Sequence, residues 1–217
     1  MNLDLKQLFD LPGAKQEIDC SLDLSKEKLY GAMPFTQPVR VAGTIENRAG
    51  VVRLVFSVKS VLRRYGNDIH DGDAFIINDP YDGGNHLPDI GIITPVFADE
   101  RLLFFCVSRA HHGDIGGSTA GSYNPKATEI FQEGIRIPPT RIMENFIICD
   151  EVMNLILINT RNPQMLKSDL SAQLGANRLA VKRIKEMVDT YGADVVEKSV
   201  ASYLEQTAIM TKKRISE

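Results

Sequence analysis

The sequence predicts an α+β fold, in which a mixed or antiparallel sheet bears two loops rich in glycine, histidine and aspartate and is followed by C-terminal helices. Two observations predict it. Short apolar runs of strand length lie in the middle of the chain, and stretches with the apolar period of an amphipathic helix occupy its last third. A run of strands followed by a run of helices is typical of the α+β class.

Composition sets the bounds on what this chain can be. The 217 residues, 43% of them hydrophobic and 24% charged, suit one large globular domain or two small ones. A net charge of −3 gives no basic footprint, so the charge does not predict nucleic acid as a partner. No apolar run reaches the roughly 18 residues of a membrane span. The N-terminus lacks the basic start and apolar core of a signal peptide, and the three cysteines form no CxxC pair, so the cytoplasm is the predicted location.

The first piece of the chain, residues 1–57, is predicted to be rich in β-structure. A short amphipathic start ends at the turn signal Pro12-Gly13. Two β-like runs follow, VRVAGTIEN at 39–47 and VVRLVFSV at 51–58, and the second is rich in β-branched residues. The residues between them suit a hairpin turn, so these two runs are predicted to pair.

The second piece, residues 58–217, begins with a stretch of helical spacing over 57–66. AFIIN at 74–78 is a candidate for a short buried strand. The runs IGIITPVF at 90–97 and RLLFFCVS at 101–108 are predicted to form an antiparallel pair that turns at Asp99-Glu100.

The last third of the chain is predicted to be helical. Helical periodicity extends over 150–159 and 164–191, and a last helix is expected at 194–212. Gly192 is expected to end the long middle helix. Six apolar side chains are predicted to line one face of that helix: Leu166, Leu170, Leu174, Val181, Ile184 and Val188.

Candidate chemistry is concentrated in two loops, NDPYDGGNHLPDIG at 78–91 and SRAHHGDIGGSTAG at 108–121. His86 and Asp89 are three residues apart, and Pro88 stiffens the arc between them. The hairpin over 90–108 returns the chain to its starting end, which brings His111 beside Asp89. Two imidazoles and a carboxylate from short loops can hold one divalent ion and leave positions open. The alternative is ordinary: a loop histidine is usually a hydrogen-bonding or surface residue, and aspartate with glycine describes common turns.

A longer likeness sharpens this prediction. GDAFIINDPYDGGNHLPDIGIITPVF, SRAHHGDIGG and ATEIFQEGIRIPP resemble the hydantoinase B/oxoprolinase family, with the likeness running over residues 57–217. The resemblance implies that His86, Asp89 and His111 bind one divalent metal. Manganese, zinc and iron all suit a ligand set of two imidazoles and a carboxylate, so the set does not decide among them.

The resemblance also implies a reaction and a partner. In this family an A-type subunit holds ATP and phosphorylates the substrate oxygen, and the B-type subunit holds the metal and completes the hydrolysis of a cyclic amide, such as hydantoin or 5-oxoproline, or the carboxylation of a ketone. The chain contains no GxxxxGK[ST] loop, so no nucleotide site is assigned to it, and the resemblance itself places ATP on the partner. His112 is the candidate for proton transfer or for orienting a ligand, and equally for a structural role in the loop.

Other polar residues receive weaker assignments. Asp114 is a candidate for orienting a histidine by accepting its N–H. Asp79 suits either this site or a turn cap, and His70 looks like an exposed turn residue without a role. Glu129 and Glu133 are four residues apart, and a solvated face explains them better than an active site.

The chain departs from the family at its N-terminus. Residues 1–57 resemble the N-terminal half of small bacterial proteins tied to large-ribosomal-RNA accumulation, where relatives have a longer region of their own. A join of two gene fragments near residues 56–59 is therefore expected, with a truncated family domain that is a poor catalyst alone. Two alternatives remain: a non-enzymatic interaction protein, which predicts no bound metal, and a stand-alone metal hydrolase, which predicts turnover without ATP or partner.

Overall fold

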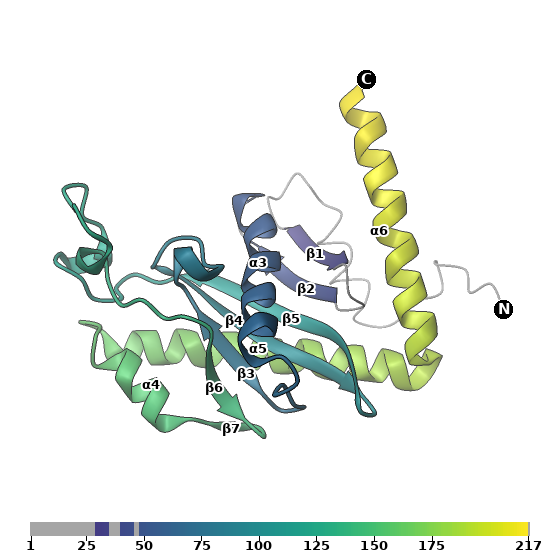
Figure 1. Cartoon of the computed structure of the whole chain (residues 1–217), viewed down its shortest axis with the longest axis horizontal. Coiled ribbons are helices and arrows are strands. Elements are labelled where there is room, and N and C mark those ends of the chain that lie inside the picture. The colour runs from purple at the N-terminus through teal and green to yellow at the C-terminus, as the bar shows by residue number, and fades with distance from the viewer. Residues whose placement is uncertain (1–28, 35–39, 46–47, 217) are drawn as a thin grey trace.

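In a computed structural model of the chain, a seven-stranded sheet is packed between helices (Figure 1). It describes residues 29–34, 40–45 and 48–216, with side chains over 54–216. The strand order is β1-β2-β5-β4-β3-β6-β7. All neighbouring strands are antiparallel except β2 and β5, which are parallel. The predicted α+β class with a mixed sheet is therefore confirmed. The strands are β1 Leu29–Pro34, β2 Arg40–Ile45, β3 Ala74–Ile77, β4 Asp89–Ala98, β5 Arg101–His111, β6 Thr140–Glu144 and β7 Ile147–Ile148.

The hairpin of β4 and β5 forms the centre of the sheet and confirms the pairing predicted from the sequence. Its register runs from Asp89 opposite His111 to Ala98 opposite Arg101. The turn between the strands places Asp99 at a φ of 52°, a left-handed conformation that aspartate tolerates better than most residues. Because the two strands have nearly equal length, the residues that enter β4 and leave β5 meet at one end.

Helices cover both faces of this sheet (Figure 1). On one face, α3 (Arg48–Tyr65) buries Leu54, Val58 and Val61 against side chains of β3, β4 and β5. On the other face, α4 (Asp150–Leu157) and α5 (Pro163–Tyr191) pack against the alternate side chains of the same strands. Both faces of the central strands are covered, which explains why their sequences are continuous apolar runs.

The prediction of a strand over 51–58, and of its hairpin with 39–47, is wrong. These residues belong to α3, and β2 instead pairs with β1 and β5. Leu54, Val58 and Val61 lie at the i, i+4 and i+7 spacing of a helix, and their burial against the sheet outweighs the β propensity of the valines. The predicted domain boundary at residue 57 lies inside α3, and the division itself remains a prediction. The amphipathic start and its Pro12-Gly13 turn lie outside the described residues.

The helical last third agrees with the prediction. In α5 the predicted apolar face is buried or partly buried along its whole length. The side chain of Asn162 caps its first turn by accepting from Met165 N, and Gly192 ends it at a φ of 83°. The last helix, α6 (Ala193–Ser216), buries Val196 against side chains of β4 and β5, and its residues 205–216 are exposed (Figure 1). Within the described part of the chain, no helix is long and apolar enough to cross a membrane.

Candidate metal centre

The first loop is built on Asn78, a fully buried residue that follows β3. Its Nδ2 donates to the carbonyls of Leu87 (2.7 Å) and Ile135 (2.9 Å), and its Oδ1 accepts from Ile137 N (2.7 Å). One carboxamide therefore links the segment just after His86 to a segment about 50 residues later in the chain. Gly84 packs so closely on Asn78 that a Cβ there would lie 2.1 Å from its carbonyl oxygen.

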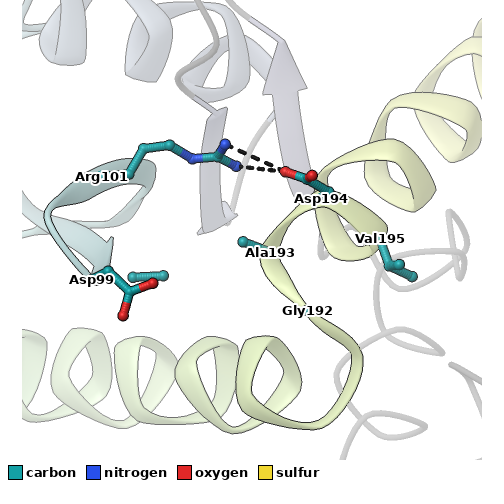
Figure 2. Close-up of a pocket in the computed structure, with 7 residues that line it drawn as sticks. Asp99, Arg101, Gly192, Ala193, Asp194 and Val195 are labelled. Carbon is teal, nitrogen blue, oxygen red and sulfur yellow. Dashed lines mark hydrogen bonds and ion pairs between the residues drawn. The ribbon is translucent and has the colours of Figure 1, made fainter.

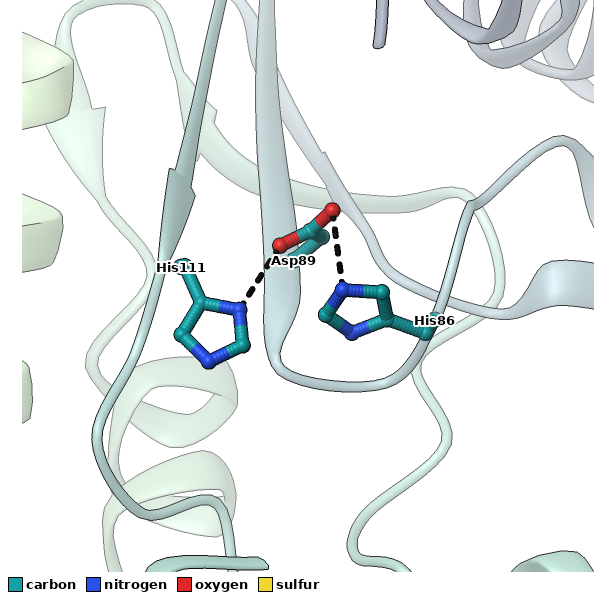
Figure 3. A group of neighbouring side chains, drawn as sticks. All are labelled: His86, Asp89 and His111. Carbon is teal, nitrogen blue, oxygen red and sulfur yellow. Dashed lines mark hydrogen bonds and ion pairs between the residues drawn. The ribbon is translucent and has the colours of Figure 1, made fainter. Parts of the chain in front are cut away.

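His86, Asp89 and His111 form a compact group at the open end of the β4–β5 hairpin (Figure 3). The Asp89 carboxylate lies between the two rings. Its Oδ2 is 3.3 Å from His86 Nε2, and its Oδ1 is 3.0 Å from His111 Nδ1. The rings are 5.1 Å apart at an angle of 67°. The structure thus brings together the three residues that the sequence pattern indicated as candidate ligands. As predicted, the β4–β5 hairpin returns the chain and places His111 opposite Asp89.

The donor set suits a divalent ion. One ligand atom from each of the three residues lies within 4.8 Å of the others, a spread that a single ion can bridge. The carboxylate is 8% exposed and is held by a 2.8 Å hydrogen bond from Asn85 Nδ2, whereas the imidazoles of His86 and His111 are 46% and 63% exposed. A fixed, buried carboxylate and two accessible imidazoles match a centre with open positions toward the solvent.

His112 lies on the other side of the backbone from this group. Its side chain is buried beneath α5, where Nε2 is 3.1 Å from Gln173 Oε1 and Nδ1 is 3.7 Å from Asp169 Oδ2. Burial lowers the pKa of the His112 imidazole, against weaker opposing effects of the Gln173 hydrogen bond and the Asp169 charge. Successive residues of an extended strand point to opposite faces, which separates His112 from His111. A role in fixing the loop therefore fits His112 better than direct proton transfer.

Asp114 organises the second loop. Its carboxylate accepts hydrogen bonds from the backbone N–H groups of Gly116, Gly121 and Arg161 and from the Arg161 guanidinium. Its partial burial acts to raise the pKa, but these bonds outweigh that effect and hold the pKa of Asp114 well below its usual range. In the described part of the chain, its hydrogen-bond partners belong to the loop and to the segment before α5, and none is a histidine ring.

A comparison with known families decides where this arrangement belongs. The model of the Hydantoinase B/oxoprolinase family matches residues 44–217. The chain belongs to this family. The match includes all three residues of the candidate centre and begins within β2, ahead of the likeness seen in the sequence.

Individual relatives agree. Caprolactamase subunit beta of Pseudomonas jessenii is 38% identical over 143 residues, which is 66% of this chain and 25% of that protein. The crystal structure of ATP-dependent caprolactamase from the same organism superposes with a TM-score of 0.67 at 36% identity, covering 69% of this chain and 26% of that one. 5-oxoprolinase 1 of Arabidopsis thaliana is 36% identical over 153 residues, 65% of this chain and 12% of that protein. The chain thus spans about a quarter or less of these family members.

Some polar residues have structural roles that the sequence left open. Asp79 caps the 3-10 turn η2 (Pro80–Asp82) by accepting from Tyr81 N and pairs with Arg136 at 2.8 Å. Glu129 and Glu133 flank another such turn, η4 (Ile130–Gln132), rather than lying on one helical face. Neither Gln173 nor Asn78 is singled out by the sequence motifs. Gln173 and Asn177 are the two buried polar residues on the apolar face of α5, and this break in the apolar pattern was the available signal.

A hollow of about 390 Å³ lies elsewhere, between the β4–β5 turn and the start of α6 (Figure 2). Arg101 pairs there with Asp194 at 3.3 Å and with Glu197. Since β4 has ten residues, its two ends are about 30 Å apart, and this hollow is remote from His86, Asp89 and His111. It contributes nothing to the family's candidate centre.

Proposed function

We propose that this chain supplies the metal-binding segment of a B-type subunit, with His86, Asp89 and His111 as ligands to one divalent ion. The observation that carries the proposal is the gathering of these three donors, from the two ends of one hairpin and the loop that adjoins it, inside the segment that matches the family. A transition metal such as manganese, zinc or iron suits this set. The subunit acts in the cytoplasm with an A-type partner that binds ATP.

Hydrolysis of a cyclic amide is the favoured reaction, since two of the relatives are named caprolactamase and 5-oxoprolinase. In this reaction a water oxygen bonds to the ring carbonyl carbon, the C–N bond breaks, and the ring nitrogen takes up a proton. The partner subunit first transfers the γ-phosphoryl group of ATP to the carbonyl oxygen, which makes the ring carbon a better electrophile for this water. The acyl phosphate left after C–N cleavage is hydrolysed by a second water to carboxylate and inorganic phosphate. Carboxylation of a ketone is the second candidate, because the acetophenone carboxylase delta subunit of Aromatoleum aromaticum is 34% identical over 178 residues.

A bound divalent ion would polarise the substrate oxygen or lower the pKa of a bound water molecule. The other polar residues of the chain orient the ligands and leave access to them. Asn85 orients the Asp89 carboxylate through a 2.8 Å hydrogen bond, and the exposed sides of the His86 and His111 rings leave access for substrate. His112 and Asp114 hold the second loop in place through their contacts with α5 and with the segment before it.

Metal content tests this proposal directly. The purified chain and its His86→Ala variant are analysed side by side by elemental mass spectrometry, with His70→Ala as the matched control. His70 is also an exposed loop histidine beside aspartates, 3.7 Å from Asp68 and 3.9 Å from Asp73. We expect close to one transition-metal ion per chain in the parent and in His70→Ala, and a loss of most of it in His86→Ala.

Two other results would redirect the assignment. A parent chain without metal would refute the site and favour the non-enzymatic interaction protein. Metal-dependent turnover of a lactam without ATP or a partner would favour a stand-alone hydrolase instead. Addition of an A-type subunit and ATP to the metal-loaded chain then distinguishes lactam from ketone substrates.

A further inference from the structure

Gln173 is a buried carboxamide on the face of α5 that packs against the sheet, 7% exposed. Its Nε2 donates to the carbonyl of Ile90 at 3.1 Å, and its Oε1 is 3.1 Å from Nε2 of His112. One side chain of a helix therefore reaches both β4 and the residue that follows β5. Burying a carboxamide among apolar neighbours is costly unless its polar atoms are paired, and here both ends are.

The chemistry of these contacts fixes the orientation of both side chains. A backbone carbonyl only accepts, so the amide nitrogen of Gln173 must face Ile90, and Oε1 must face His112. Since Oε1 only accepts, Nε2 of His112 must carry a hydrogen. The other ring nitrogen, Nδ1, is buried and makes no hydrogen bond within the described residues, and it lies 3.7 Å from Asp169 Oδ2. Gln173 thereby fixes a hydrogen on Nε2 of His112 and the position of its ring.

Both contacts lie one residue from a proposed metal ligand. Ile90 follows Asp89, and His112 follows His111. A backbone hydrogen bond also joins these two strand ends, because His112 N donates to the carbonyl of Pro88 at 2.9 Å. The ends of β4 and β5 are therefore joined twice behind the metal centre, once by the backbone and once through Gln173.

We propose that Gln173 is a positioning residue for the metal centre, which fixes the separation of Asp89 and His111 by tying both strand ends to α5. The inference rests on the proposed function, because it assigns Gln173 a purpose at that same centre. It makes the affinity for the ion depend on a residue of α5 that touches none of the three ligands.

Asn177 provides a matched control. It lies one helical turn further along α5, is 3% exposed, and also donates to the sheet, with Nδ2 2.9 Å from the carbonyl of Ile92 and 3.2 Å from that of Cys106. Its contacts are two or more residues further from the ligands. Replacing Asn177 by leucine removes a comparable link between α5 and the hairpin and leaves the metal end untouched.

The first test measures the affinity for Mn²⁺ or Zn²⁺ by competition with a chelator. We compare the parent with Gln173→Met, which keeps the size and loses both hydrogen bonds, with Gln173→Glu, which keeps an acceptor for His112 only, and with Asn177→Leu. Gln173→Met is expected to weaken binding about 10- to 100-fold, the range for residues that orient metal ligands, and Gln173→Glu is expected to recover part of that loss. Asn177→Leu is expected to bind as the parent does. Equal affinity in the parent and in Gln173→Met overturns the inference.

The second test needs no metal. In the metal-free chain, ¹⁵N NMR of the histidine rings, assigned through His112→Gln, reports which nitrogen of His112 carries the hydrogen. We expect the Nε2–H form in the parent and in Asn177→Leu, and a mixture in Gln173→Met. An Nδ1–H form in the parent overturns the inference. A parent that binds no metal refutes the proposed function alone, and this spectrum still decides whether Gln173 orients His112.

Discussion

Asp89 and His111 face each other across the open end of the β4–β5 hairpin, with Asp89 Oδ1 3.0 Å from His111 Nδ1. They are the first residue of β4 and the last residue of β5. A shift of one residue in the pairing would turn one of these side chains to the opposite face, so the register of the apolar hairpin also sets the geometry of the polar group. The buried core of the sheet and the candidate centre are therefore specified together.

Asp89→Asn tests the charge of that pair. The variant keeps the shape and one acceptor, but the neutral amide is a poor ligand and presents N–H groups to one imidazole. We expect metal content to fall below about a tenth of the parent value while the circular dichroism spectrum is unchanged. Asp99→Asn, an exposed aspartate at the other end of the same strand, is the control and should bind metal normally. Full metal retention in Asp89→Asn would exclude Asp89 as a ligand.

The sequence predicts the central hairpin, the short strand β3 and the C-terminal helices because each has a clear apolar period and clear turn signals. It misassigns residues 51–58, where valine-rich composition suggests a strand and the spacing of Leu54, Val58 and Val61 also fits a helix. The hairpin of β6 and β7 is missed as well. Its two-residue turn, Asn145-Phe146, has φ values of 48° and 65°, and phenylalanine is an unusual residue for that conformation.

The candidate centre is predictable because its three ligands come from one hairpin and one adjoining loop, so local geometry nearly determines it. The buried polar residues that hold these ligands in place cannot be predicted from local geometry. Gln173 and Asn177 reach the hairpin from α5, more than 60 residues after His111, and only the packing of α5 on the sheet shows which polar atoms they meet. Asp114 was assigned to a histidine from its place in the loop, whereas its partners depend on where Arg161 lies.

Gly84→Ala tests the close packing of the first loop. An alanine Cβ would lie 2.1 Å from the carbonyl oxygen of Asn78, a backbone atom that cannot move without displacing the loop. We expect a loss of about 3 kcal/mol in the free energy of unfolding, at the upper end for overpacking, together with weaker metal binding. The control is Gly175→Ala on the exposed side of α5, where nothing lies within 4 Å. That change should stabilise the chain by about 0.5–1 kcal/mol.

Asn78→Leu tests the link between the two distant segments. Leucine fits the buried volume but leaves the carbonyls of Leu87 and Ile135 without a donor and Ile137 N without an acceptor. Each buried unpaired group costs about 1–3 kcal/mol, so we expect a loss of at least about 3 kcal/mol in urea unfolding. Asn154→Leu, on the exposed side of α4, should change stability by less than about 0.5 kcal/mol. Similar stabilities for the two variants would show that Asn78 does not hold the loop.

Asp114→Asn tests whether the ionised Asp114 carboxylate stabilises the second loop, and how that contribution depends on pH. Because the folded-state pKa of Asp114 lies below its ordinary value of 3.8, the ionised carboxylate stabilises the fold at pH values above about 4, and this contribution is lost as the pH falls through and below that value. Asparagine accepts fewer hydrogen bonds and turns an N–H group toward the Arg161 guanidinium or a loop amide. We expect the variant to be less stable by about 2–3 kcal/mol at pH 7, with the difference constant down to about pH 5 and shrinking toward pH 2. Denaturant unfolding of both proteins across that range measures it, with Asp189→Asn on the exposed face of α5 as the control for loss of one negative charge. A difference that does not vary with pH would mean that the ionised form of Asp114 has no special partner in the folded chain.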